Sequence, residues 1–443
     1  MSPPRVSVAL LSWNGREHLA TCLAALRAQE DPGVPWEVLV LDNGSTDGTA
    51  AWVRAEHPEV RLVESPVNLG FCAGNNRLVA EARGEAVAFL NNDTRPQPGW
   101  LRALVAAYAA APEDVAAVSG KIVDWVGERL DFGRGVMTFD GHAFQLDFRK
   151  PLSLAVVPEV GEELLFACGG NMLIRKSSFL AAGGFDEDYF AYLEDVDLGW
   201  RLWAGGERIT FVPDAVVHHR SSATSDLLGL FNRGFLFERN AFLTAYKNYE
   251  PGLWEKVMPA LLLTFISRTQ AMLVGNNPGG DRLRLDPYAG HIANTAPKGA
   301  AANPLPALPP SEPRTLASLA RKLRDYGPRE FARRGWKKLN AQLSPPVLPA
   351  SPLPPTLTDE RTIAQFRALS YLLGHLDRAA AHREAVQKRR RRSDREIFAR
   401  FPPYLVPTYP GDAELFASPG FTTWLPEELP LVRKTLPEIM EWG

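Results

Sequence analysis

The sequence predicts an α/β protein whose first part is a mostly parallel sheet with helices on both faces. Apolar segments of strand length alternate with helical patterns over about the first 120 residues, in the order βαβαβ. Such an order requires crossover helices and therefore a parallel sheet. With 443 residues, of which 45% are hydrophobic, the chain can bury a sizeable core.

The individual elements of this first part follow from local patterns. The run 86–90 is wholly apolar, which is typical of a strand buried on both faces. Further strands are expected at 6–11, 36–41 and 60–63. One face of a helix is marked by Leu19, Cys22, Leu23 and Leu26, and further helices are expected after Thr46, Phe71 and Gln97.

A second patterned region runs from 166 to 225. We expect a strand over Phe166–Arg175, containing a pair of glycines, 169 and 170, that permits close approach to the backbone. A helix is then marked by apolar residues at helical spacing: Leu193, Val196, Trp200 and Trp203. Strands are expected at 209–213 and 215–217, and two histidines follow the second of them.

Charge and cysteine content exclude several classes of protein. The formal net charge of -2 implies no polyanionic partner, so no nucleic acid is expected. Three cysteines without paired spacing indicate neither a disulfide framework nor a zinc site, which fits a reducing cytoplasm.

We see no signal peptide. The most apolar segment, Met258–Ile266, is interrupted by Arg268, well short of the roughly 20 apolar residues that a membrane-spanning helix needs.

The C-terminal part differs from the rest in composition. From Arg314 to Arg400 the chain carries about 20 Lys and Arg against about 8 Asp and Glu, including the run Lys388–Arg392. Pro-rich joints at 303–310 and 344–349 favour extended linkers. We therefore expect an α/β domain over 1–250, a helical segment and Pro-rich linker over 251–310, and a basic, mainly helical region over 311–443.

Polar side chains follow every predicted strand of the first part, at 12–15, 42–47, 68–71 and 91–93. Ligands bind at the carboxyl ends of parallel strands. Four polar ends in a row therefore favour a binding site over four unrelated turns. Neither G-x-G-x-x-G nor a P-loop is present, so a bound nucleotide would be held by side chains and a metal.

The stretch Leu90-Asn91-Asn92-Asp93-Thr94 has two interpretations. Asn, Asp and Thr are common where a strand ends in a turn. A carboxylate at this place is also a hard ligand for Mg²⁺ or Mn²⁺, which prefer one or two carboxylates together with substrate phosphates. Of the two histidines at 218 and 219, one is a candidate ligand for the same ion.

Three acids, Glu194, Asp195 and Asp197, lie at the start of the helix predicted in the second region. Acids there have a structural explanation, because they complement the helix dipole. Three acids within four positions also repel one another, which raises at least one pKa toward that of a general base. Asp195 is the candidate for that base.

Six short motifs follow one another along the chain: Ser12-Trp13-Asn14-Gly15, Asp42-Asn43-Gly44-Ser45-Thr46-Asp47-Gly48-Thr49, Asn68-Leu69-Gly70-Phe71, Leu90-Asn91-Asn92-Asp93, Gly184-Phe185-Asp186-Glu187 and Glu194-Asp195-Val196-Asp197-Leu198. In this order they resemble the inverting family-2 glycosyltransferases, most of all the rhamnosyltransferase-like branch. The resemblance spans roughly residues 5–240 and implies a GT-A fold, followed here by the helical, Pro-rich and basic extension.

The resemblance also implies roles for residues of this chain. The nucleotide and donor sugar would be bound by Ser12, Asn14, Asp42, Asn43, Asn68, Gly70, Asn75, Asn91, Asn92 and Asp93. The family often has Asp-x-Asp where this chain has Asn91-Asn92-Asp93, so Asp93 is the carboxylate expected to bind the metal. The pair Glu194-Asp195 would be catalytic, with Asp195 as the base. The histidine that contacts the metal would be His219, with His218 as the alternative.

The activity implied by the resemblance is metal-dependent transfer of a sugar from a nucleotide-sugar to a hydroxyl group, with inversion in a single displacement. L-rhamnose from dTDP-rhamnose is the expected donor, with a UDP-sugar next. The acceptor would be a glycan or lipid-linked glycan in cell-surface polysaccharide synthesis. The protein would be cytoplasmic, or peripheral on the inner face of the membrane.

The basic C-terminal region suggests where such an acceptor would be met. Each Lys or Arg near an anionic membrane contributes on the order of 1 kcal/mol to binding. The run Lys388–Arg392 has alternative explanations as a solvated helix face or a contact for another subunit or nucleic acid.

Two other classes share part of this evidence. A non-catalytic protein that binds nucleotide-sugar or glycan would have the same fold, but the presence of both Asp93 and Asp195 disfavours it. A sugar nucleotidyltransferase would also combine an α/β sheet with Mg²⁺. It should carry a Gly-rich, basic loop after the first strand, where this chain has Ser12 to Arg16.

Overall fold

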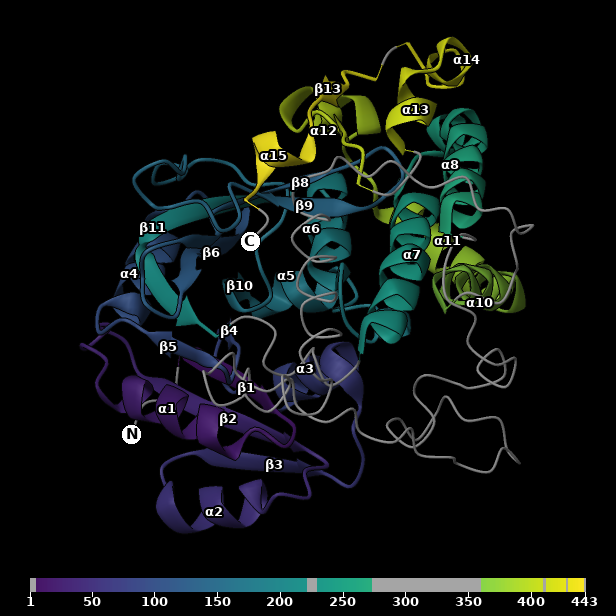
Figure 1. Ribbon diagram of the computed structural model, residues 1–443. Coiled ribbons are helices and arrows are strands. Elements are labelled where there is room, and N and C mark those ends of the chain that lie inside the picture. Colours follow the sequence, from purple (N-terminus) through teal and green to yellow (C-terminus); the bar gives the residue numbers. More distant parts are fainter. Residues whose placement is uncertain (1–4, 221–228, 273–359, 409–411, 428, 442–443) are drawn as a thin grey trace, which may run out of the picture. The chain divides into compact units, whose positions relative to one another are not determined.

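The first part of the chain alternates strands and helices as predicted. The computed structural model describes residues 5–220, 229–272, 360–408, 412–427 and 429–441 (Figure 1). The elements of the first part are β1 (Val6–Ser12), α1 (Arg16–Arg27), β2 (Trp36–Asn43), α2 (Thr49–Glu56), β3 (Arg61–Ser65), α3 (Gly70–Glu81), β4 (Ala86–Leu90), β5 (Thr94–Pro96) and α4 (Trp100–Ala110).

The second part adds antiparallel strands and the helix that carries the three acids. Its elements are β6 (Val115–Asp124), β7 (Leu130–Phe132), β8 (Arg134–Met137), β9 (Ala143–Leu146), β10 (Asn171–Arg175), α5 (Lys176–Ala181), a short 3₁₀ helix (Glu187–Tyr189), α6 (Glu194–Ala204) and β11 (Arg208–His219).

Nine of these strands form one mixed sheet in the order β3-β2-β1-β4-β10-β6-β11-β5, with β7 paired to β6 beside this path, whereas β8 and β9 pair with each other in a separate sheet. Strands β3, β2, β1 and β4 are parallel, whereas β10 runs antiparallel to both of its neighbours. Helix α3 packs on β1 and β2, α4 packs on β6 and β11, and α6 packs on β11. The mixed, mostly parallel sheet flanked by helices is confirmed.

Burial explains why the predicted strand and helix patterns were reliable in the first part. All five residues of β4 are buried, because the strand lies between β1 and β10 in the centre of the sheet. On α1 the buried residues are the four that the sequence indicated, Leu19, Cys22, Leu23 and Leu26.

Two predicted elements of the second part differ from the structure. The strand expected over Phe166–Arg175 begins only at Asn171, because the Asn171 N–H donates to the Cys168 carbonyl and closes a turn over the two glycines. The strands expected at 209–213 and 215–217 are one strand, β11, with a register shift between Val212 and Val216. Such an irregularity accommodates Pro213, which has no N–H to give to the ladder.

The described C-terminal elements are mainly helical, as predicted, and share the core of the α/β part. They are α7 (Gly229–Asn248), α8 (Pro251–Met272), α10 (Glu360–Gly374), α11 (Leu376–Arg389), α12 (Asp394–Arg400), β12 (Tyr404–Leu405), α13 (Asp412–Ala417), α14 (Pro419–Thr422), β13 (Val432–Arg433) and α15 (Leu436–Ile439). Helices α10 and α11 pack against α7, and α12 packs against α6. The predicted boundary near 310 lies outside the described residues.

Helix α8 contains the most apolar segment of the sequence, Met258–Ile266. Arg268, near its end, is buried and contacts Asp140 at 2.9 Å and Asp412 at 3.1 Å. None of the described helices is long and apolar enough to cross a membrane.

Candidate active site

The polar strand ends of the first part meet, as expected for the carboxyl edge of a parallel sheet. The Asn92 side-chain amide donates to the Ser12 hydroxyl at 3.1 Å, which links the ends of β4 and β1. The Asn14 N–H donates to the Ser45 hydroxyl at 2.9 Å, which links the loops after β1 and β2. The strand ends are therefore one continuous rim rather than separate turns.

The loop between β3 and α3 is held to the end of β2 by amide side chains. The Asn43 amide donates to Asn68 Oδ1 at 2.8 Å, and the same oxygen accepts the Gly70 N–H at 2.8 Å. Gly70 has a φ of +79°, and a Cβ there would lie 2.3 Å from the Phe190 ring, so only glycine fits. Asn75 donates to the Phe71 carbonyl within α3.

Asp42, at the end of β2, is a buried carboxylate of the rim. Burial raises its pKa above the usual value, although hydrogen bonds from Ser45 counteract this. Its Oδ1 has no hydrogen-bond partner among the described residues. A buried carboxylate oxygen without a partner is costly, so Asp42 is suited to accept hydrogen bonds from a ligand. Ser12 and Asn14, by contrast, already use side-chain oxygens to join the loops.

Asp93 and His219 face each other at the ends of β4 and β11. His219 Nε2 lies 3.4 Å from Asp93 Oδ1, and Nδ1 of the same ring lies 2.6 Å from Asp131 Oδ2. Successive strand residues point to opposite faces, so His218 points away from this site. Its Nε2 lies 3.2 Å from the Gln97 amide nitrogen instead. The alternative metal ligand, His218, is therefore not beside Asp93.

The Asp93, His219 and Asp131 arrangement fits a divalent metal ion. Burial by itself would lower the pKa of His219, but Asp131 and Asp93 outweigh it and raise the pKa to about 10. Surroundings that stabilise a proton between His219 and Asp93 also favour another cation there. Two ligands of one Mg²⁺ are on the order of 3 Å apart, close to the separation seen here. Asp131, on β7, would orient the imidazole as a carboxylate partner.

The three acids of α6 have clearly different environments. Glu194 is buried, and burial together with the charge of Asp195 raises its pKa well above the usual value. Burial raises the pKa of Asp195 to about 6, although hydrogen bonds from the backbone N–H groups of Gly169 and Val196 lower the pKa in part. Asp197 contacts Arg201 at 2.7 Å and Lys247 at 3.0 Å, and despite burial these cations lower its pKa.

Asp195 is thus the carboxylate of the three that combines a general-base pKa with access to a substrate. Its Oδ2 accepts the Gly169 N–H at 3.3 Å, and its side chain is partly exposed. The raised pKa of Glu194 favours its neutral form, and Asp197 is engaged in ion pairs with Arg201 and Lys247. Separation of the pKa values of neighbouring acids is a hallmark of acid–base catalysis.

Comparison with known proteins identifies the family. The model of "Glycosyl transferase family 2" matches residues 7–181. The N-acetylglucosaminyl-diphospho-decaprenol L-rhamnosyltransferase of Mycobacterium tuberculosis is 34% identical over 241 residues, which cover 49% of this chain and 76% of that protein. The chain belongs to glycosyl transferase family 2. It is a glycosyltransferase of the rhamnosyltransferase-like branch, and its sheet and helices are those of the expected GT-A fold.

Other glycosyltransferases match over a similar part of the chain. Glycosyltransferase AglE of Haloferax volcanii is 32% identical over 235 residues, covering 51% of this chain and 70% of AglE. Among solved structures, residues 1–349 of S. aureus TarS align with a TM-score of 0.42 at 16% identity, covering 61% of this chain and 74% of that one.

The sequence reasoning missed Asn240 of α7, which holds the turn that precedes Glu194 and Asp195, the candidate catalytic acids. Phe190, Tyr192 and Leu193 all have a φ between 63° and 70°, which is strained for residues with a side chain. The Asn240 amide donates to the carbonyls of residues 189, 191 and 192, at 3.1, 2.8 and 2.7 Å. It lies some 45 residues downstream, and no local pattern marks it.

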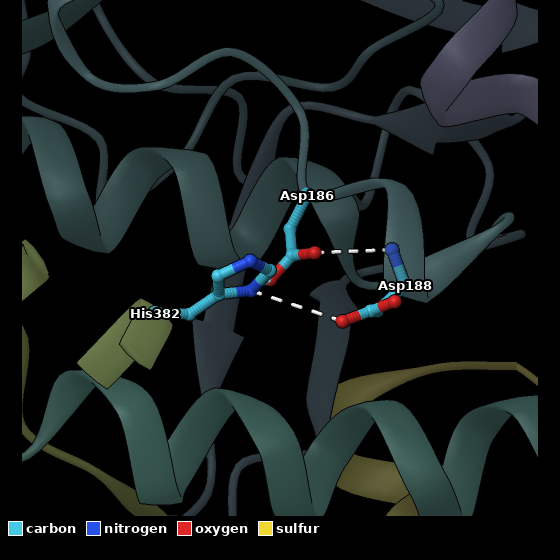
Figure 2. Close-up of side chains that lie close together, drawn as sticks. All are labelled: Asp186, Asp188 and His382. Atoms are coloured by element: carbon cyan, nitrogen blue, oxygen red, sulfur yellow. Dashed lines mark hydrogen bonds and ion pairs between the residues drawn. The ribbon is translucent and has the colours of Figure 1, made fainter. Parts of the chain in front are cut away.

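A second cluster of acidic side chains lies between the segment that precedes α6 and helix α11. Asp186 and Asp188 face His382 of α11, whose Nδ1 is 3.0 Å from Asp186 Oδ2 (Figure 2). These three could in principle hold a metal ion. Lys247 Nζ contacts the same Asp186 oxygen, however, so the chain itself supplies the cation. We interpret this cluster as a set of ion pairs that holds the Gly184–Glu187 motif against α11.

The basic run Lys388–Arg392 is partly used inside the molecule. Arg390 pairs with Asp394 at 2.8 Å, and the Arg392 guanidinium lies 5.0 Å from the centre of the Trp203 ring. The other three side chains are exposed. Only part of the run is therefore available to an anionic surface.

Proposed function

We propose that this glycosyltransferase moves a sugar from a nucleotide-sugar donor to a hydroxyl of a lipid-linked glycan, with inversion at the anomeric carbon. The observation that carries the proposal is the pairing of a partly exposed base, Asp195, with a cation site at Asp93 and His219. Both are at the carboxyl edge of the same sheet. Such a site can both deprotonate the attacking hydroxyl and stabilise the leaving nucleoside diphosphate in a single displacement.

In the proposed reaction the protein takes part chemically through a single proton transfer, from the acceptor hydroxyl to Asp195. The acceptor oxygen forms a bond to the anomeric carbon while the bond from that carbon to the phosphate oxygen breaks. Asp195 takes the proton of the acceptor hydroxyl, and the electron pair of the broken bond leaves with the nucleoside diphosphate. A divalent Mg²⁺ or Mn²⁺ at Asp93 and His219 would neutralise the charge that develops on this leaving group.

The donor nucleotide is placed on the β1–β2 side of the rim in this proposal. Asp42 offers a buried carboxylate oxygen there, suited to accept N–H or O–H groups of a base or ribose. Asn68 and Gly70 would line the donor pocket beside it, since their hydrogen bonds keep that loop in place.

The sugar and acceptor are proposed from the relatives. The M. tuberculosis relative is named for L-rhamnose transfer to N-acetylglucosaminyl-diphospho-decaprenol. We propose dTDP-rhamnose as the donor, with a UDP-sugar next, and a glycan on a lipid carrier as the acceptor. The enzyme would act in cell-surface polysaccharide synthesis, in the cytoplasm or on the inner face of the membrane.

Calorimetric titration of dTDP and UDP, with and without Mn²⁺, tests the donor site. We expect Mn²⁺-dependent binding that Asp93→Asn removes, while Asp214→Asn, a change to an exposed aspartate on β11, leaves it intact. Transfer would release free nucleoside diphosphate and form a glycoside of inverted anomeric configuration, which NMR can assign. Binding of neither nucleotide under any metal, or release of pyrophosphate instead, would contradict the proposal.

A further inference from the structure

A cleft of about 420 Å³ opens beside the cation site, on the side away from β1 and β2. Its wall includes the arginine residues 129, 149 and 220, the aromatic residues Trp125 and Phe148, and His219, together with three acids, Asp124, Asp131 and Glu441. In the sheet, β4 and β10 separate β1 from β6, which leads into the turn that carries Trp125. The cleft is therefore distinct from the rim assigned to the nucleotide, but it shares His219 with the cation site.

Arginine guanidinium groups stack on aromatic rings at this cleft. The Arg220 guanidinium lies 4.1 Å from the centre of the Trp125 ring, and that of Arg149 lies 5.2 Å from the centre of the Phe148 ring. Among the described residues neither has a carboxylate partner, whereas Arg129 pairs with Glu441 at 2.8 Å. Arginine stacked on a ring keeps its N–H groups available for a phosphate, which it binds in a bidentate manner.

The turn that carries Trp125 is fixed before any ligand binds. Asp124 Oδ1 accepts the backbone N–H groups of residues 127, 128 and 129, at 2.9, 2.7 and 3.0 Å. The Arg95 guanidinium also lies over the Trp125 ring, 4.8 Å from the ring centre. Two guanidinium groups on one ring concentrate positive charge, which favours a ligand with more than one negative charge.

The cleft is also close to the proposed base. The Gly169 N–H donates to Asp195 Oδ2 at 3.3 Å, and the carbonyl of the next residue, Gly170, accepts the Asn91 N–H at 3.4 Å. Asn91 lies two positions before Asp93, which faces His219 at the cleft. An acceptor whose hydroxyl reaches Asp195 can therefore extend toward Asp131 and the arginine side chains.

Exposed aliphatic side chains surround the same end of the molecule. Val126, Leu154 and Val156 are 68%, 72% and 70% exposed. The Leu152 N–H donates to the Glu128 carbonyl at 2.9 Å, which places the turn after residue 151 beside the turn at 125–128. Exposed apolar side chains next to the stacked Arg149 and Arg220 are suited to a surface that is apolar inside and anionic at its head groups.

We propose that this cleft binds the diphosphate of the lipid-linked acceptor, with Val126, Leu154 and Val156 against the membrane that holds the lipid. The inference rests on the proposed function, because it places that function's acceptor. The Arg149 and Arg220 guanidinium groups contact the diphosphate, and the glycan extends past His219 toward Asp195. The donor diphosphate could supply the same chemistry, so the experiment separates the two sources.

Farnesyl diphosphate is a soluble probe for this cleft, and its binding is measured by calorimetry in EDTA, so that no metal captures the diphosphate at Asp93. We expect Arg149→Gln and Arg220→Gln each to weaken its binding about 10-fold or more, the effect of losing charge-assisted hydrogen bonds. Mn²⁺-dependent binding of dTDP or UDP should not change. Arg83→Gln, a change to an exposed arginine at the amino end of β4, is the matched control.

The outcomes separate this inference from the proposed function. No binding of farnesyl diphosphate to the unaltered protein, or equal binding by the two variants, overturns the acceptor site while nucleotide binding still supports the transferase. Weaker nucleotide binding by the variants also overturns it, because the arginine residues would then hold the donor. Absence of nucleotide binding in the unaltered protein contradicts the proposed function itself.

A second measurement tests the membrane contact. Vesicles of phosphatidylcholine containing undecaprenyl diphosphate are sedimented with the protein. The double change Val126→Ser and Leu154→Ser should reduce co-sedimentation several-fold without altering the affinity for farnesyl diphosphate. Leu180→Ser, which removes an exposed leucine on α5, should have no effect. Equal co-sedimentation of all three proteins would exclude this surface as the membrane contact.

Discussion

Replacement of Asp195 by Asn should abolish transfer while making the protein more stable at neutral pH. The pKa of this partly buried carboxyl is about 6, against an ordinary value of 3.8. A shift of one pKa unit corresponds to about 1.4 kcal/mol, so the charged form costs the folded state about 3 kcal/mol. An asparagine avoids this cost because it carries no charge.

The pH dependence follows from the sign of this shift. Since the pKa is raised in the folded state, folded protein holds the proton between about pH 4 and 6 while unfolded protein has lost it. The contribution of this carboxyl to the free energy of unfolding is therefore fully present below pH 4 and is lost as the pH rises through 6. The advantage of Asp195→Asn should approach about 3 kcal/mol at pH 8 and vanish near pH 4.

Urea unfolding of the two proteins at pH 4.5, 6 and 8 measures this difference. Asp197→Asn is the matched control on the same helix. The pKa of Asp197 is lowered by Arg201 and Lys247, so its replacement should destabilise the protein at pH 8. Transfer by Asp195→Asn should fall by about 10² to 10⁴, the usual contribution of a general base. A destabilised Asp195→Asn, or a stability difference that does not depend on pH, would refute the reasoning.

Three further substitutions have defined outcomes. Asp131→Asn should weaken Mn²⁺-dependent nucleotide binding by about 10- to 100-fold, because His219 loses the carboxylate that orients it; unchanged calorimetry would contradict this role. Arg268→Met removes the buried guanidinium that contacts Asp140 and Asp412 and should lower the free energy of unfolding by about 3 to 5 kcal/mol, which urea denaturation measures. Asn240→Ala removes the donor from three carbonyls before α6, so kcat should fall about 10-fold or more while nucleotide affinity is kept; a variant of normal kcat would show that the turn holds its shape unaided.

The described part of the chain after residue 360 packs on α6 and is not simply an appended basic segment. Phe398 of α12 lies 5.0 Å from Trp200 of α6 between ring centres, and both side chains are buried. His382 of α11 contacts Asp186, which precedes α6 in the chain. Because these contacts cover the helix that carries Asp195, removal of the region would disturb the active site as well as any membrane contact.

The sequence by itself determined the α/β layout, the polar rim and the candidate base. Apolar runs such as 86–90 and the helical spacing on α1 are local patterns, and their burial follows from local chain geometry. The meeting of Ser12 with Asn92 could be predicted because parallel strands share one carboxyl edge. Asp195 could be selected because three neighbouring acids cannot all keep ordinary pKa values.

Tertiary structure decided which of these groups act together. Asp131 stands between Leu130 and Phe132 on a short buried strand, and only the pairing of β7 with β6 brings it to His219, 88 positions along the chain. The choice between two adjacent histidines depended on which face of β11 lies on the side of Asp93, and the difference between Glu194 and Asp195 depended on their burial. These properties arise from contacts between distant segments, so no local pattern in the sequence could fix them.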